Sequence, residues 1–202
     1  MKREKKRKKE KLHYSTLWTV VASCLICLVV LTFSFTISWG LRMKTLEETS
    51  SSNVFKEFDT QTIYEEKIDN TDIIGAKITA FNIWETTCPA CLGEMGALEE
   101  LSKKYPADEF RLVGVCADVY DRNGNLKPDQ IKKAQKLMDD AGVSFTNIIP
   151  TKEMLAFFKS VIPGYPTTFF VDSSGHILEF TSGSNDYEGW VEKVDKVLAN
   201  AK

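Results

Sequence analysis

The sequence predicts an α/β domain, in which helices flank a mixed β-sheet, with one N-terminal transmembrane helix before it. Along residues 54–202, apolar runs typical of buried strands alternate with segments of helical periodicity. Residues 17–41 contain no Lys, Arg, Asp or Glu, and a helix of this length, at about 1.5 Å per residue, crosses a hydrocarbon layer of about 30 Å. We therefore expect a basic cytoplasmic tail at 1–16, a transmembrane helix at 17–41, a linker at 42–53 and the α/β domain at 54–202.

The charge distribution predicts the orientation of this helix. Residues 1–16 hold eight Lys or Arg and two Glu, whereas residues 42–202 hold 18 basic and 26 acidic residues. Basic flanks stay in the cytoplasm, and Trp18 and Trp39 stand near the two ends of the apolar segment, where aromatic rings favour the membrane interface. We expect a single-pass protein of the cell membrane with an extracytoplasmic domain, and no nucleic-acid partner.

Two alternatives to an uncleaved signal anchor are a cleaved signal peptide and a lipoprotein. The apolar segment is longer than the usual signal-peptide core of about 7–15 residues, and no clear cleavage site follows it. Val21–Cys24 loosely resembles a lipoprotein cleavage box, but uncharged residues continue well beyond Cys24. Cys24 and Cys27 are interpreted as small apolar helix residues without chemistry.

The domain begins after a polar, Ser-rich linker whose composition offers too little apolar surface to pack. The expected elements are a buried strand at 77–84, a helix at 89–104, a buried strand at 111–115, a helix at 128–141, a short strand at 144–149, a short helix at 152–161, a strand at 167–172, its hairpin partner at 176–181 and a helix at about 187–199.

Helical spacing and end signals support the three longer helices. Four apolar side chains recur along the first, Cys91, Met95, Leu98 and Leu101. The second opens on Pro128 and closes before Gly142. The last places four apolar side chains on one side, Trp190, Val194, Val197 and Leu198. A domain of roughly 150 residues has enough core to be stable without structural disulfides.

Two thiols three positions apart, Cys88 and Cys91, form the most informative motif, because they can close and reopen a disulfide. Pro89 suits the first position of a helix, which puts Cys88 at the helix N-terminus. The unpaired N–H groups and the helix dipole there favour a thiolate, so we expect the pKa of Cys88 below its free value of about 8.5. Cys88 would attack a substrate disulfide, and Cys91, deeper on the same face, would resolve the mixed disulfide.

Other chemistry is poorly supported. A zinc site needs about four ligands, and outside the apolar segment at 17–41 the only further thiol, Cys116, and the imidazole of His176 lack a paired spacing. We interpret Cys116 as a core thiol and His176 as an exposed hairpin residue. Neither histidine is near Cys88 in the sequence, which disfavours a cysteine–histidine hydrolase.

Two segments in this order resemble the thioredoxin superfamily: Trp84–Cys91 (WETTCPAC) after an apolar strand, and Gly164–Asp172 (GYPTTFFVD) about 75 residues later. More narrowly, residues 54–200 resemble membrane-anchored thiol-disulfide oxidoreductases of the TlpA/ResA type. The helix at 128–141 matches the insertion that distinguishes this branch. The resemblance implies a thioredoxin-like fold with a redox-active Cys88–Cys91 disulfide and no other cofactor.

The resemblance also implies roles for the residues around the dithiol. Pro166 is expected to be a cis proline that faces the cysteines and, with Tyr165, offers backbone groups to a substrate strand. Glu94 matches a family glutamate near the active site, where a carboxylate could relay the proton of Cys91 or raise the thiol pKa values; a solvated helix charge is the alternative. Trp84 matches a tryptophan that borders the cysteines, although it would also suit the core. Pro89, between the cysteines, is grouped with the substrate-binding residues.

Two positions depart from the family pattern. Thr87 stands where many relatives carry Trp, which puts the shape of the substrate face in doubt. Gly96 stands where proline often follows the Glu-Met pair, which puts a kink of the active-site helix in doubt.

The resemblance favours a disulfide reductase of exported proteins that a CcdA-type membrane carrier keeps reduced, with apocytochrome c as one candidate substrate. A DsbA-like oxidant that forms disulfides in secreted proteins is the alternative within redox chemistry, and a non-catalytic binding module is the alternative outside it. A peroxidase is disfavoured because Phe81 and Glu85 occupy the positions of Pro and Thr/Ser in the Pro-x-x-x-Thr/Ser-x-x-Cys pattern of peroxiredoxins.

Overall fold

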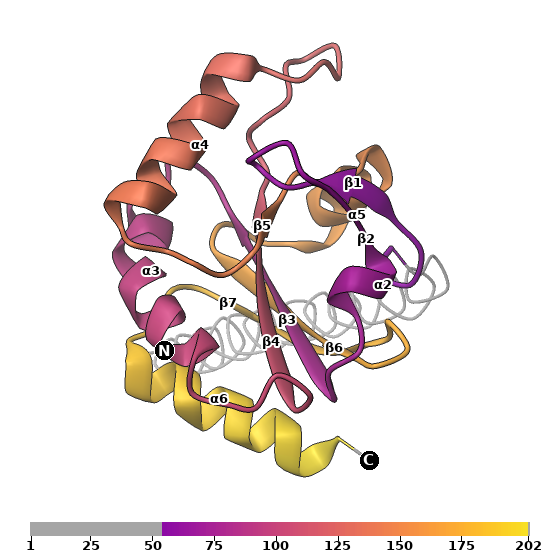
Figure 1. Cartoon of the computed structure of the whole chain (residues 1–202), viewed down its shortest axis with the longest axis vertical. Helices are drawn as coiled ribbons and strands as arrows, with labels where there is room; N and C mark the ends of the chain where they lie inside the picture. Colours follow the sequence, from indigo (N-terminus) through magenta and orange to yellow (C-terminus); the bar gives the residue numbers. More distant parts are fainter. Residues whose placement is uncertain (1–53, 202) are drawn as a thin grey trace, which may run out of the picture. The chain divides into compact units, whose positions relative to one another are not determined.

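A five-stranded mixed sheet forms the centre of residues 54–201, which are the part of the chain described by the computed structural model (Figure 1). Its strands lie in the order β5 (Asn147–Ile148), β4 (Phe110–Cys116), β3 (Ile78–Trp84), β6 (Thr167–Asp172) and β7 (Ile177–Ser182). β3, β4 and β5 run parallel, whereas β6 is antiparallel to both β3 and β7. The predicted mixed sheet is confirmed.

Helices cover both faces of this sheet. α3 (Pro89–Ser102), α4 (Pro128–Asp140) and α6 (Tyr187–Asn200) share one core cluster with the side chains of β3 and β4 that point to that face. α5 (Lys152–Val161) contributes to an aromatic cluster on the opposite face, which contains Phe55, Phe81, Phe157, Phe158 and Phe169. In Figure 1, α3 and α4 lie to the left of the sheet and α5 to its right.

The boundaries of these elements follow local signals. Pro89 and Pro128 occupy the first turns of α3 and α4, and the side chains of Thr151 and Asp186 cap α5 and α6. The expected strand at 144–149 is shorter, only Asn147–Ile148. The other predicted elements agree with the structure to within two residues at each end.

The sequence-based prediction missed three short elements, β1 (Asp59–Gln61), β2 (Lys67–Asp69) and α2 (Asn70–Ile73). β1 and β2 form a separate antiparallel pair. α2 is a single turn held by a capping box between Asp69 and Asp72. Elements of three or four residues are too short for hydrophobic periodicity to reveal them.

The predicted tail, transmembrane helix and linker at 1–16, 17–41 and 42–53 lie outside the described residues. No helix within 54–201 has both the length and the apolar character needed to cross a membrane.

Strand register brings the two sequence motifs together. Ile83 of β3 pairs with Thr167 at the start of β6, and Trp84 pairs with Cys116 at the end of β4. The chain leaves the C-terminal end of β3 toward Cys88 beside the point where it enters β6 from Pro166. The dithiol and the proline motif therefore meet, although about 75 residues separate them.

Candidate active site

Cys88 and Cys91 form a disulfide at the N-terminus of α3, with their Cα atoms 5.3 Å apart. Cys88 is the N-cap residue, and its Sγ accepts a hydrogen bond from the backbone N–H of Cys91 at 3.2 Å. Cys88 is half-buried, whereas Cys91 is 0 % exposed. A disulfide partner from solvent can therefore reach Cys88, while Cys91 is shielded from it.

The Tyr165–Pro166 peptide bond is cis, as the resemblance implied. Pro166 is buried and its carbonyl already accepts a hydrogen bond from Gly183 N–H at 2.9 Å, so that carbonyl is not free for a substrate strand. Tyr165 is half-buried, and neither its N–H nor its carbonyl takes part in a turn or loop backbone hydrogen bond within residues 54–201. Of the two residues expected to pair with a substrate backbone, Tyr165 is the one that is free to do so.

Two ionisable side chains, Glu85 of the cysteine loop and Tyr165 of the proline loop, have raised pKa values. Glu85 stands three residues before Cys88, and Tyr165 stands directly before cis-Pro166. Burial, and secondarily the charge of Glu85, raises the pKa of Tyr165 to about 12. Burial also raises the pKa of Glu85, helped by the charge of Asp118.

Glu94 lies inside the protein, one helical turn beyond Cys91, and is 2 % exposed. Its carboxylate accepts hydrogen bonds from three groups: Asn82 Nδ2 at 3.0 Å, Asn185 N–H at 3.1 Å and Trp190 Nε1 at 3.2 Å. Burial raises the pKa of Glu94 to about 7, although these donors, which favour the carboxylate, oppose the rise. The alternative of a solvated helix charge is wrong, because this carboxyl is buried.

Trp84 is 0 % exposed, so its side chain is part of the core beneath the dithiol and not of the surface that a substrate would meet. Its indole Nε1 donates to Asn147 Oδ1 at 2.9 Å. Asn147 lies over Gly114, where an added Cβ would come within 1.9 Å of Oδ1. The absence of a side chain at Gly114 therefore makes room for the Trp84–Asn147 hydrogen bond.

The other residues singled out in the sequence lie as follows. Pro89, the first residue of α3, is exposed, and so is Thr87 on the other side of Cys88 in the chain. α3 continues through Gly96 as one helix to Ser102. Cys116 is a core thiol, 0 % exposed, and burial raises its pKa well above the ordinary value. His176 is exposed in the hairpin, as expected.

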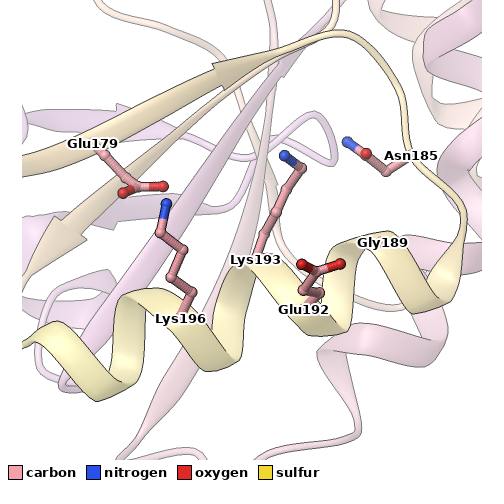
Figure 2. A pocket seen from close by; sticks show the side chains of 6 residues that line it. All are labelled: Glu179, Asn185, Gly189, Glu192, Lys193 and Lys196. Carbon is pink, nitrogen blue, oxygen red and sulfur yellow. The ribbon is translucent and has the colours of Figure 1, made fainter.

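The dithiol does not lie in the pocket of about 250 Å³ that opens between β7 and α6. Figure 2 shows Lys193 and Lys196 rising from α6 into this pocket, with Glu179 across from them. None of the predicted site residues lines it. Within residues 54–201, no group of three or more His, Cys, Asp or Glu side chains could hold a metal ion.

Sequence reasoning missed the polar residues that hold the site, namely Asn82, Asp118, Gln130, Asn147 and Asn185. One of them had a signal: Asn82 is a lone amide within the apolar strand predicted at 77–84, and a buried polar side chain requires a partner. Asn185 had none, because it acts through its backbone N–H.

Comparisons with known proteins show which family this chain resembles. Residues 52–180 match the model of the AhpC/TSA family. The thioredoxin-like protein YneN of Bacillus subtilis is 29 % identical over 139 residues, which cover 69 % of this chain and 75 % of that protein. The thiol:disulfide interchange protein DsbE of Vibrio cholerae is 28 % identical over 141 residues, covering 67 % of this chain and 68 % of that protein.

Solved structures show the same fold. A thiol:disulfide interchange protein of Chlorobium tepidum superposes with a TM-score of 0.58 at 20 % identity, covering 71 % of this chain and 94 % of its own. StoA of Bacillus subtilis gives a TM-score of 0.52 at 21 % identity, covering 67 % and 94 %. The fold is therefore thioredoxin-like. With its Cys-x-x-Cys pair, this chain belongs to the AhpC/TSA family and is a thiol-disulfide oxidoreductase of the ResA and DsbE type.

Proposed function

We propose that this protein is an extracytoplasmic disulfide reductase of exported proteins, held at the cell membrane by a helix at 17–41 with its N-terminus in the cytoplasm. The observation that carries the proposal is the asymmetry of the dithiol: Cys88 is half-buried at a helix N-cap, and Cys91 is wholly buried behind it. Such a pair exchanges disulfides with a partner through one sulfur only.

The reduced enzyme would act in two exchanges. The Cys88 thiolate attacks one sulfur of the substrate disulfide, a mixed disulfide forms, and the other substrate sulfur leaves as a thiolate. The Cys91 thiolate then attacks Cys88 Sγ, which closes the Cys88–Cys91 disulfide and releases the second substrate sulfur. Two electrons pass to the substrate, and the dithiol is the only redox group that we propose. The Cys91 N–H that contacts Cys88 Sγ would stabilise its negative charge.

Glu94 supplies a destination for the proton of Cys91. A buried thiol must lose its proton before it can attack, and a carboxyl that titrates near neutral pH can take it. Glu94 is on the same helix, one turn from Cys91, and is shielded from bulk water. We propose that it accepts this proton during the second exchange.

Tyr165 would hold the substrate. Its free backbone groups directly precede cis-Pro166, in the loop that leads into β6, and an extended substrate segment could pair with them as an added strand does. Pro89 and Thr87, which are exposed beside Cys88, would contact the same segment.

Relatives such as thiol-disulfide oxidoreductase ResA of Bacillus anthracis, 27 % identical in a match that covers 63 % of this chain, support disulfide exchange as the reaction, and the reductive direction is our proposal. We propose that a CcdA-type membrane carrier returns two electrons and two protons to the Cys88–Cys91 disulfide. Oxidised apocytochrome c is one candidate substrate.

Equilibrium with glutathione tests the direction. We expect the soluble domain to have a reduction potential of about −250 mV or lower, as reductases do. A value of about −120 mV would identify an oxidant that forms disulfides. Insulin reduction provides the catalytic readout. A non-catalytic binding module would show no turnover, and the Cys88→Ser variant would then not differ from the unmodified domain.

A further inference from the structure

A network of side chains holds the turn that carries Cys88. The turn runs from Glu85 to Cys88, between the end of β3 and the start of α3, and is closed by a hydrogen bond from Cys88 N–H to the Glu85 carbonyl at 3.2 Å. Inside it, Thr86 is only 3 % exposed, although it carries a hydroxyl and an N–H that need partners. Those partners come from another part of the chain.

Asp118, just after β4, provides them. Its carboxylate accepts the Thr86 N–H at 3.2 Å and 3.1 Å through its two oxygens, and the Thr86 hydroxyl at 2.8 Å. Without this carboxylate, two buried donors in the turn would be unpaired, which costs about 1–3 kcal/mol each.

Gln130, in the first turn of α4, closes the network. Its Nε2 donates to Asp118 Oδ2 at 2.6 Å and also to the Thr86 hydroxyl oxygen. The Thr86 hydroxyl thus donates to one residue and accepts from the other. The thiol of Cys116 contacts Asp118 Oδ1 at 3.5 Å. Hydrogen bonds from Gln130 therefore connect α4 to the cysteine turn.

The charge of Asp118 reaches the residues around the dithiol. It contributes to the raised pKa values of Glu85, three residues before Cys88, of Tyr165, directly before cis-Pro166, and of Cys116. The carboxylate is bound to the turn that carries Cys88, and a nearby negative charge disfavours a further negative charge on a sulfur. Because a stabilised thiolate makes a dithiol more oxidising, a disfavoured one makes it more reducing.

We propose that Asp118 and Gln130 are positioning residues of the dithiol: they fix the Cys88 turn from α4, and the Asp118 charge shifts the dithiol toward donating electrons. The proposal concerns the dithiol alone and holds for any substrate.

Two substitutions separate charge from position. Asp118→Asn removes the charge, but its amide can still bond the turn: Oδ1 accepts from Thr86 N–H, Nδ2 donates to the Thr86 hydroxyl, and Gln130 inverts its amide. Asp118→Ala removes both charge and bonds. Asp121→Asn is the matched control, because Asp121 lies in the same connection and its carboxylate bonds only its own loop, at Asn123 and Asn125.

The measurements are the equilibrium of the Cys88–Cys91 pair with glutathione and the rate at which the reduced domain reacts with a small aromatic disulfide. We expect both Asp118 variants to shift the equilibrium at least threefold toward the dithiol. Only Asp118→Ala should slow the exchange, by about tenfold. Asp121→Asn should match the unmodified domain in both. An equilibrium of Asp118→Asn equal to that of Asp121→Asn overturns the charge effect.

Thermal unfolding identifies a variant that fails to fold. If Asp118→Ala does not fold, Gln130→Leu tests the position, since it removes only the bonds from α4. A slower exchange at an unchanged equilibrium is expected for Gln130→Leu, and an unaltered exchange rate refutes the positioning role. Neither readout involves an exported substrate, so a negative result here is distinct from a failure of the proposed reductase function.

Discussion

The indole of Trp190 on α6 donates a hydrogen bond to the carboxylate of Glu94 on α3, and both side chains are nearly inaccessible to solvent. This contact joins the helix that carries the dithiol to the C-terminal helix by polar atoms as well as by apolar packing. It also fixes the carboxyl group behind Cys91. The chemistry proposed for the dithiol depends on a carboxyl held in this way.

Glu94→Gln should alter the pH dependence of stability. The pKa of Glu94 is about 7 in the folded protein and 4.5 for the free group. The folded state therefore holds the Glu94 proton more tightly than the unfolded state does. The stabilisation is fully present below about pH 4.5 and is lost as the pH rises through 7. At about 1.4 kcal/mol per pKa unit, the loss of unfolding free energy is roughly 3 kcal/mol.

Urea unfolding at pH 5 and pH 8 should show that the unfolding free energy of Glu94→Gln falls less than that of the unmodified domain. An equal fall in both proteins would contradict the assignment.

Asn82→Ala should raise the pKa of Glu94 further, because the Asn82 amide is one of the donors that favour the carboxylate. The midpoint of the pH profile for resolution by Cys91 should move to higher pH. Thr79→Val is the control, since it changes a buried polar residue of the same strand whose hydroxyl has no hydrogen-bond partner among residues 54–201. If both substitutions leave the midpoint unchanged, the Asn82–Glu94 contact has no influence on proton transfer.

Gly114→Ala should destabilise the domain by about 1–3 kcal/mol. The new methyl group would occupy the position of the Asn147 side chain, and its displacement would leave the Trp84 indole N–H buried without an acceptor. Thermal denaturation measures the effect. Gly114→Ala combined with Asn147→Ala should recover part of the loss, because the clash is then gone; a double variant less stable than Gly114→Ala would argue against this packing.

Gly96→Ala should stabilise the domain by about 0.5–1 kcal/mol. Gly96 is exposed within α3, and in the described part of the chain no atom lies within 4 Å of an added Cβ. Alanine therefore gains helix propensity without a clash. Urea denaturation measures the change, and insulin reduction should be unaffected. A loss of stability would indicate that α3 needs the glycine at this position.

The sequence was sufficient for the elements that carry the site and for its sulfur chemistry. A buried strand followed by Cys88-Pro89 defines a helix start, and hydrophobic spacing defines which side of that helix faces the core. Burial of Cys91 behind Cys88 followed from the same spacing, and the structure confirms it.

The surroundings of the dithiol could not be obtained in this way. Glu94 has the same helical spacing whether its carboxyl is solvated or buried, and only the approach of Asn82 and Trp190 decides between the two. Asp118 and Thr86 are 32 residues apart and pair because β3 and β4 end side by side. The sequence allowed Trp84 either to border the cysteines or to pack in the core. In the structure its side chain is wholly buried at the end of β3.

Trapping of mixed disulfides tests whether Cys88 is the attacking thiol and Cys91 the resolving thiol. The reduced Cys91→Ser and Cys88→Ser domains are incubated with oxidised exported proteins, and mixed disulfides are counted after alkylation. We expect stable mixed disulfides on Cys88 in Cys91→Ser and essentially none in Cys88→Ser. Trapping by Cys88→Ser through Cys91, with none by Cys91→Ser, would contradict these roles.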